Sequence, residues 1–230
     1  MLSAMASVGV LHIEGDRVLV PVAAFGHRGF RAWVTSEQYP EGIRASWIDG
    51  EVFVEMSPES IDSHNKVKAA ITAALQRLAD EEELGEVYAD GVLYTHEEAG
   101  VSTEPDLAFA TFTTLEAGRL RLRPRAGRDD EWIEIVGTPD VVLEIVSDAS
   151  VRKDLIQLRE AYRRAGIAEY WIVDARTDEL RFDVLRLDGD VYRAAAPSGR
   201  PQPSAVFGRT FCLERRRNRV GRWAYRLASE

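Results

Sequence analysis

The sequence predicts an α/β protein in which a mixed central β-sheet is flanked by helices. Apolar runs at 140–147 and 169–174 are typical of strands that are buried on both faces. Between these runs lies one apolar helical stripe, at Leu155, Leu158, Tyr162 and Ala165. Gly166 then supplies a residue favoured after helix ends. Strand, helix and strand in this order form a crossover unit, so the two strands are expected to be parallel.

Composition places the chain among ordinary globular proteins. Of its 230 residues, 45% are hydrophobic and 29% are charged. No stretch approaches the roughly 20 apolar residues of a membrane span, and the N-terminus lacks the features of a secretory signal. The single cysteine, Cys212, excludes an internal disulfide framework and is expected to be a buried small hydrophobe. We therefore expect a cytoplasmic protein with no membrane partner.

The first third of the chain predicts a hairpin followed by a long helix. A short strand is expected at Arg17–Val20, inside an N-terminal extension covering 1–30. A hairpin over 46–58 turns at Asp49–Gly50, with alternating apolar residues at Val52, Val54 and Met56. A helix then runs from about Asp62 to Glu83, with one apolar stripe along it.

The remaining elements are strands and hairpins. Strands are expected near 86–95 and 105–110, and two strands around a polar loop form a β-hairpin insertion over 115–136. A further hairpin follows 169–174 and turns at Asp188–Gly189. We interpret residues 1–230 as one α/β domain.

Two carboxylates interrupt apolar strands. Glu144 lies in the middle of the run at 140–147, and Asp106 follows Pro105 at the start of another strand. A lone buried carboxylate costs several kcal/mol, so each needs a compensating cation or hydrogen-bond donors. Asp106 can cap a turn or pair with an arginine, and Glu144 can pair with a buried base. Together, with Lys153 nearby, they suit a hard cation such as Mg²⁺, as metal-assisted phosphodiester cleavage requires.

These residues also carry a resemblance. The segment EPDLAFA, followed by GTPDVVLEIVSDASVRKDLIQLREAYRRAGIAEYWIVDAR, resembles the Uma-type family of putative restriction endonucleases in the PD-(D/E)XK nuclease superfamily. The resemblance covers most of the chain. It implies a restriction-endonuclease-like core with extra β-hairpins and an Mg²⁺-dependent endonuclease (Mn²⁺ as substitute) that cuts DNA, by analogy as a homodimer. It implies that Asp106 and Glu144 are the metal ligands.

The sequence departs from the family pattern at the lysine. Val146 stands two residues after Glu144, and the family's alternative position on the following helix is Leu158. Lys153 is the nearest replacement. On a regular α-helix it would point roughly 140° away from Leu158. It can therefore act only if the chain there is not regularly helical or if its long stem reaches around; otherwise it is a solvated lysine.

His64 occupies a place where the family often carries a histidine. The resemblance implies that it orients water, contacts phosphate or ligates metal, although a structural role at the helix start is equally consistent with the sequence. An acid often found before the hairpin turn is replaced here by Ser46 or Trp47, and Glu51 and Glu55 should point away from the apolar face.

Four further features of the sequence receive structural interpretations. Asp148 and Asp154 are expected to cap the helix, and the aromatic pair at 170–171 is expected to lie in the core. The basic stretches at 119–128 and 215–223 are expected to be solvated surface in preference to a DNA track, and the first can instead be a hairpin whose arginines alternate outward. The departures at Ser46 and Leu158 keep a second function open, a nuclease-like fold that no longer cuts and binds nucleic acid or a protein.

Overall fold

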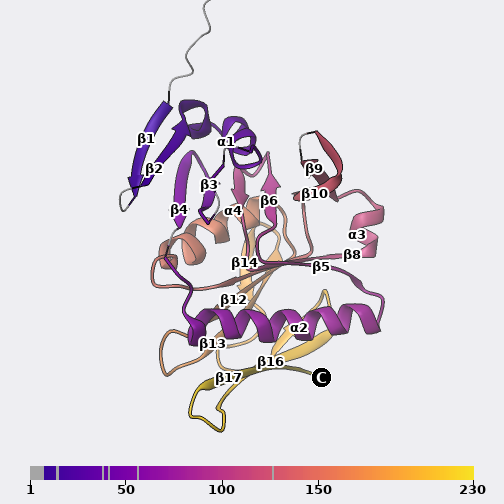
Figure 1. The fold of residues 1–230 in the computed structure, drawn as a ribbon. Coiled ribbons are helices and arrows are strands. Elements are labelled where there is room, and N and C mark those ends of the chain that lie inside the picture. Colours follow the sequence, from indigo (N-terminus) through magenta and orange to yellow (C-terminus); the bar gives the residue numbers. More distant parts are fainter. Residues whose placement is uncertain (1–7, 14–15, 38, 41, 56, 126) are drawn as a thin grey trace, which may run out of the picture.

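The structure is a computed structural model that describes residues 8–13, 16–37, 39–40, 42–55, 57–125 and 127–230, with only the backbone described for 8–13 and 16–19. Its strands form two six-stranded sheets and two smaller ones (Figure 1). The first large sheet, here called the upper sheet, has the order β4-β3-β7-β6-β10-β9. Its strands are β3 (Arg44–Ile48), β4 (Glu51–Glu55), β6 (Leu93–His96), β7 (Val101–Thr103), β9 (Leu120–Arg125) and β10 (Arg128–Gly137).

The second large sheet, here called the central sheet, has the order β14-β13-β12-β11-β8-β5. Its strands are β5 (Gly85–Ala89), β8 (Leu107–Thr111), β11 (Val141–Ile145), β12 (Glu169–Asp174), β13 (Arg181–Asp188) and β14 (Val191–Ala194). The smaller sheets are the hairpin β1 (Val8–Ile13) and β2 (Asp16–Pro21), and the three-stranded β15 (Gln202–Ser204), β16 (Arg209–Arg217) and β17 (Trp223–Ser229).

Helices connect and cover these sheets. The longest is α2 (Lys66–Glu81), which continues a π-helical turn, η2 (Ile61–Asn65). The crossover between β11 and β12 consists of a second π-helical turn, η3 (Lys153–Leu158), and α4 (Arg159–Arg164). The remaining helices are η1 (Val22–Phe25), α1 (His27–Val34) and α3 (Phe112–Glu116). No helix among the described residues is long and apolar enough to cross a bilayer.

The central sheet is mixed. β11 and β12 are parallel, as the crossover predicts, whereas β8 and β13 run antiparallel to their neighbours. The predicted fold class is therefore confirmed, although the strands divide over two large sheets instead of one. The hairpin turn at Asp49–Gly50 is also confirmed, since both residues have positive φ.

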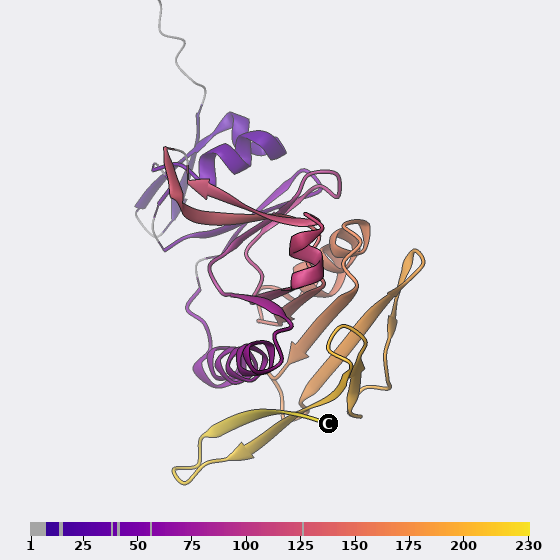
Figure 2. The ribbon, with the colours of Figure 1, turned by 90° about the vertical axis from the view of Figure 1, so that its right-hand side faces the viewer.

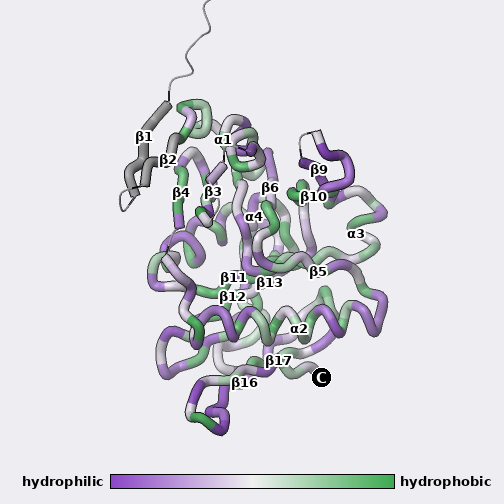
Figure 3. The backbone as a smooth tube through the Cα atoms, viewed as in Figure 1, coloured by the Kyte–Doolittle hydropathy of each residue, from purple (hydrophilic) through white to green (hydrophobic). Residues whose placement is uncertain are grey.

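Both faces of the central sheet are buried, and β11 alternates between them. One core cluster lies between the two large sheets and includes Val142, Tyr162 and Tyr170. The other lies between the central sheet, α2 and the β16–β17 hairpin, and includes Leu143 and Trp171 (Figure 2). Hydrophobic residues accordingly concentrate in the central strands, as Figure 3 shows. Because side chains alternate along a strand, Glu144 shares the Val142 face, toward the upper sheet and α4.

Several sequence predictions need correction. The expected strand near 86–95 is two strands, β5 and β6, in different sheets, because Gly91 turns the chain with φ +86°. Cys212 is exposed, since it alternates with the inward-facing Phe211 and Leu213 on β16. Met56 lies outside the described residues. The assignments of 1–30 as an extension and 115–136 as an insertion stay predictions.

Candidate active site

Asp106 and Glu144 meet where the ladder between β8 and β11 ends. The antiparallel register pairs Val142 with Ala108 and Leu143 with Leu107, so its continuation places Asp106 opposite Glu144. Residues opposite each other in an antiparallel pair have their Cβ atoms about 5 Å apart on one face of the sheet. Both side chains are buried, with exposed fractions of 6% and 4%. The register thus places two acids from separate sequence segments at the same end of the ladder, with the Asp106 carboxylate contacting η2 and α2 and the Glu144 carboxylate contacting α4.

Three donors surround the Asp106 carboxylate. Its Oδ2 accepts a hydrogen bond of 2.7 Å from the backbone N–H of Ile145. The Nζ of Lys68 lies 3.1 Å from Oδ1, and the Nε2 of His64 lies 3.4 Å from Oδ2. Burial raises the pKa of Asp106, but the contacts with His64, Lys68 and the Ile145 amide outweigh burial and lower it. Asp106 is therefore held as an anion.

Lys68 and His64 extend this arrangement into a cluster, here called the His64 cluster. It comprises the acids Glu59, Asp90 and Asp106 and the bases Arg44, His64 and Lys68. Glu59 is its second centre: its Oε1 accepts from Lys68 at 2.7 Å and from Arg44 at 2.6 Å. Burial lowers the pKa of His64, but Asp106 and Glu59 outweigh it and raise that pKa. Acids and bases are balanced in this cluster.

Glu144 has a different environment on the other side of Asp106. Its Oε1 accepts a hydrogen bond of 2.6 Å from the hydroxyl of Tyr162, a residue of α4. Burial, followed by the charges of Asp154 and Asp106, raises the pKa of Glu144 well above its ordinary value. Burial likewise raises the pKa of Asp154 to about 7, against the opposing effects of Lys153 and Ser150. These carboxylates repel one another, and Lys153 does not offset that repulsion fully.

Asp154 was expected to cap a helix, and that expectation is wrong. The side chain has an exposed fraction of only 2%. Its Oδ2 accepts from the Ser150 hydroxyl, whereas its Oδ1 is buried and has no hydrogen-bond partner among the described residues. Ser147 takes the cap position instead, accepting from the backbone N–H of Ser150 at 3.1 Å. A buried carboxylate oxygen without a donor calls for a proton, a water molecule or a cation as its partner.

Lys153 reaches this group because the helix around it is not regular. Residues 153–158 form the π-helical turn η3, in which hydrogen bonds join positions i and i+5. Lys153 and Leu158 are therefore one turn apart on the same side, instead of the ~140° apart expected for an α-helix. Both are buried. The Nζ of Lys153 bonds Glu55 and lies 3.9 Å from Asp154 Oδ1. Glu55 lies on the Phe53 face of β4, away from Val52 and Val54 as predicted, and this face is turned toward Lys153.

A second cluster can now be defined, here called the Glu144 cluster. Among the described residues it contains the acids Glu55, Glu144 and Asp154 and the single base Lys153. Burial lowers the pKa of Lys153, but the charges of Glu144, Asp154 and Glu55 outweigh burial and raise it. When all three acids are ionised, one base leaves a deficit of positive charge. A divalent cation at this place would remove that deficit. Asp106 links the two clusters, because it contacts His64 and Lys68 and also interacts electrostatically with Glu144.

Another trio also has the donor types of a metal site. Ligand atoms of Glu59, His64 and Asp106 lie within 4.8 Å of one another. However, Lys68 and Arg44 already neutralise Glu59, and Lys68 also contacts Asp106. A cation there would be repelled by these bases. Carboxylate oxygens alone suit Mg²⁺ better than a nitrogen-containing set. The charge balance around this trio therefore does not call for a further cation.

The two clusters border an open cleft of about 640 Å³. Its walls come from the end of β4, the segment 57–60, η2, the turn 147–149 and the residue Lys153. Arg44 and Arg176 line it as well. Arg176 is fixed by Asp174 and by Asp148, to which it donates at 3.0 Å. With His64 and Lys153, the cleft thus presents four basic side chains, which pair with the acids Glu55, Glu59 and Asp148 in the same lining.

Comparison with known proteins agrees with this architecture. The model of the family Uma2, described as "Putative restriction endonuclease", matches residues 33–212. The chain belongs to this family. A solved structure, described as "a putative nuclease belonging to DUF820" from Anabaena variabilis, has a TM-score of 0.53 at 15% identity. The match covers 71% of this chain and 83% of that chain and shows a shared nuclease fold. A search of curated proteins found no match.

The structure brings all four sequence-predicted site residues of this Uma2 protein to one region. All four are buried, but only His64 and Lys153 line the cleft, whereas Asp106 and Glu144 lie behind its lining residues. Ser46, where the family often has an acid, instead bonds Thr103 at 2.8 Å. The third acid near the site is Asp154, supplied by η3. Their roles stay predictions.

Sequence reasoning missed Lys68 and Glu59. Lys68 follows Val67, which belongs to the buried apolar stripe of α2. Its position next to that stripe was the one feature of the sequence that could have indicated its burial. Glu59 lies in the connection before η2 and had no periodic signal. Tyr170 and Trp171 are fully buried, which confirms the prediction that they are core aromatics.

Proposed function

We propose that this Uma2 protein is a metal-dependent endonuclease that hydrolyses phosphodiester bonds in DNA, with Mg²⁺ held by Asp106 and Glu144. The observation that supports the proposal is the β8–β11 register, whose continuation places these two buried acids opposite each other, together with the charge interaction of Glu144 with Asp106 and Asp154. The unpartnered Oδ1 of Asp154 supports the same place. When bound, the ion supplies stabilisation of developing negative charge and acidifies a water molecule.

The protein's own residues supply the remaining functions. Lys153 carries its ammonium at the edge of the cleft, so it can stabilise negative charge on the phosphate or orient the attacking water. His64 is held as a donor toward Asp106 and keeps that carboxylate ionised. Arg44 and Arg176 line the cleft and attract the phosphodiester backbone.

Calorimetric titration with Mn²⁺ tests the metal site. We expect binding by the wild type and loss of binding in Asp106→Asn and in Glu144→Gln. Glu59→Gln is the matched control, because it removes an acid that contacts Lys68 but does not belong to the proposed ligand pair. Retained binding in Glu59→Gln supports the proposal, whereas loss there with retention in Glu144→Gln would move the ion to the Glu59–His64–Asp106 trio. Plasmid nicking with Mg²⁺ then tests cleavage.

A second candidate function rests on Leu158. This residue stands where the family commonly carries its lysine, and it is fully buried in the core between the sheets. Lys153 in turn is bonded to Glu55. A nuclease-fold protein that binds nucleic acid or a protein without cutting would show this pattern. This second candidate would be favoured if the wild type bound Mn²⁺ but did not nick plasmid DNA, while Asp106→Asn and Glu144→Gln bound no Mn²⁺ under the same conditions.

A further inference from the structure

The β16–β17 hairpin carries the densest group of arginines in a chain of net charge −9. Its tip, residues 215–223, reads RRRNRVGRW and contains five arginines and no acid. The hairpin projects from the body of the molecule beneath the start of α2, as Figures 1 and 2 show. Its tip is largely hydrophilic in Figure 3. This segment, here called the arginine hairpin, was expected to be ordinary solvated surface.

The arginine hairpin is ordered by its own contacts. Arg215 and Arg217 stack on Trp223, with their guanidinium carbons 4.4 and 3.4 Å from the ring centroid. The side chain of Asn218 closes the tip, because its Oδ1 accepts from the backbone N–H groups of Val220 and Arg222, each at 3.0 Å. The arginines are therefore presented from a fixed scaffold, which reduces the entropy lost on binding.

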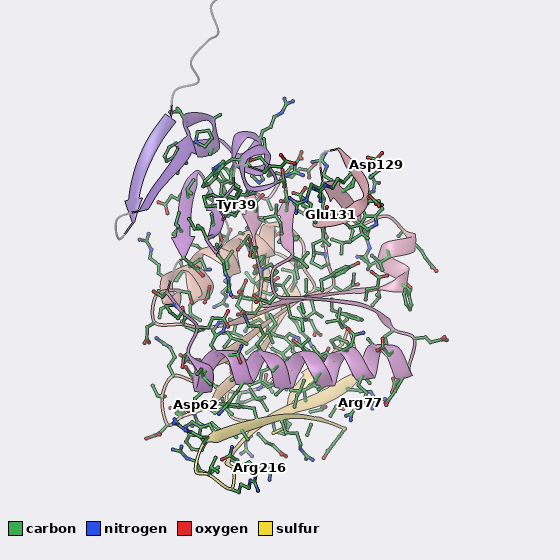
Figure 4. All side chains as sticks on the ribbon, viewed as in Figure 1. Tyr39, Asp62, Arg77, Asp129, Glu131 and Arg216 are labelled. Atoms are coloured by element: carbon green, nitrogen blue, oxygen red, sulfur yellow. The ribbon has the colours of Figure 1, made fainter. Side chains whose placement is uncertain are left out.

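The arginine hairpin also adjoins the candidate active site at two points. Lys66, two residues after His64, donates from Nζ to the backbone carbonyl of Trp223 at 3.0 Å. Arg215 donates to the carbonyls of Thr177 and Asp178, directly after the cleft residue Arg176. Figure 4 labels Asp62 in η2, just before α2, and Arg216 on the hairpin below it. The hairpin thus contacts residues that adjoin the cleft at two points.

Two arginines at the tip have no carboxylate to neutralise them. Arg216 and Arg219 are exposed and form no ion pair with any residue that the structure describes. Arg222 lies 3.8 Å from Asp62, which Lys66 also contacts at 2.5 Å. By contrast, the other basic stretch is partly neutralised, since Arg125 and Arg128 both pair with Glu131. The uncompensated charge is therefore concentrated at the hairpin.

We infer that the arginine hairpin binds backbone phosphates of duplex DNA next to the segment in the cleft. This inference rests on the proposed function for its choice of DNA. Guanidinium groups match phosphate geometry with two parallel hydrogen bonds. Contacts of this kind position a protein on the duplex without reading its sequence. The hairpin therefore contributes affinity and placement, not recognition of a base sequence.

The test measures DNA binding as a function of salt, by fluorescence anisotropy of a labelled duplex in EDTA. The variant R216Q/R219Q/R222Q removes three charges from the tip. If each arginine contacts one phosphate, the plot of the logarithm of the association constant against log[salt] should become less steep, and its negative slope should decrease in magnitude by about 2.7. Between 50 and 200 mM salt the wild type should then lose roughly 40-fold more affinity than the variant. R216K/R219K/R222K keeps the charges and should keep the slope.

A matched control removes three exposed arginines elsewhere, as R121Q/R193Q/R200Q, and should bind like the wild type. The inference would be overturned if R216Q/R219Q/R222Q showed the same salt dependence as R121Q/R193Q/R200Q. It would also be overturned if the wild type did not bind duplex DNA at 50 mM salt. Displacement of the DNA by an equal concentration of duplex RNA of the same sequence would overturn the assignment to DNA. Because EDTA removes metal ions, the result is independent of whether Asp106 and Glu144 bind a cation.

Discussion

Replacing Asp154 with asparagine should stabilise the metal-free protein at pH 8 and leave its stability nearly unchanged below pH 4. The reason is the buried charge: burial raises the pKa of Asp154 from its ordinary 3.8 to about 7. Between these two pH values the native state keeps a proton that the unfolded chain has released. The free energy of unfolding therefore falls as the pH rises, and three pKa units correspond to about 4 kcal/mol.

The asparagine introduced by Asp154→Asn is nearly isosteric with the original side chain. Its amide oxygen can still accept from the Ser150 hydroxyl, and its amide NH₂ group replaces the carboxylate oxygen that has no donor among the described residues. The variant should thus gain up to about 4 kcal/mol over the wild type at pH 8, with the gain decreasing steadily toward pH 4.

Urea unfolding in EDTA at several pH values, followed by tryptophan fluorescence, measures this difference. Trp171 is fully buried in the central sheet, so its emission reports on global unfolding. Asp190→Asn, which changes an exposed acid, is the control and should show no difference that depends on pH. A gain in Asp154→Asn that is the same at every pH, or a variant less stable than the wild type at pH 8, would refute the reasoning. Either result would mean that Lys153 already compensates the charge.

Three further predictions concern the same region. Lys68→Met should lower the free energy of unfolding by about 3–5 kcal/mol, because it leaves buried acids without their ammonium partner; equal stability in urea would contradict the balanced charge of the His64 cluster. Lys153→Ala should abolish plasmid nicking while Mn²⁺ binding is kept, and unchanged nicking would remove this lysine from the mechanism. Mn²⁺ affinity should fall from pH 8 to about pH 5, because protons compete for Glu144 and Asp154, whose pKa values are raised. An affinity that calorimetry finds constant over this range would contradict that competition.

Local signals in the sequence were sufficient for much of the fold. The Asp49–Gly50 dipeptide, which readily adopts positive φ, predicted the β3–β4 hairpin. Two apolar runs around a helical stripe predicted the β11–α4–β12 unit. Asp106 and Glu144 stand out for a similar reason, since each is a charge within an apolar strand. Their meeting required only that β8 and β11 be neighbours, which the register confirms.

Long-range features were beyond the sequence patterns. The division of strands between the upper and central sheets depends on pairings between distant segments, such as β6 with β10. The π-helical turn η3 has no simple periodic signal, so the α-helical spacing placed Lys153 on the wrong side. Asp154 looked like a capping residue because helix starts favour aspartate, and only its burial shows otherwise.

The hydrogen bond from the Ile145 backbone to Asp106 has a practical consequence. This amide proton is held by a side chain of the site, so its exchange with deuterated solvent reports when that carboxylate moves away. The exchange rate of one backbone position can therefore follow the opening of the site in real time. It needs neither a dye nor a substrate, and it can be read equally well in variants that cannot cut.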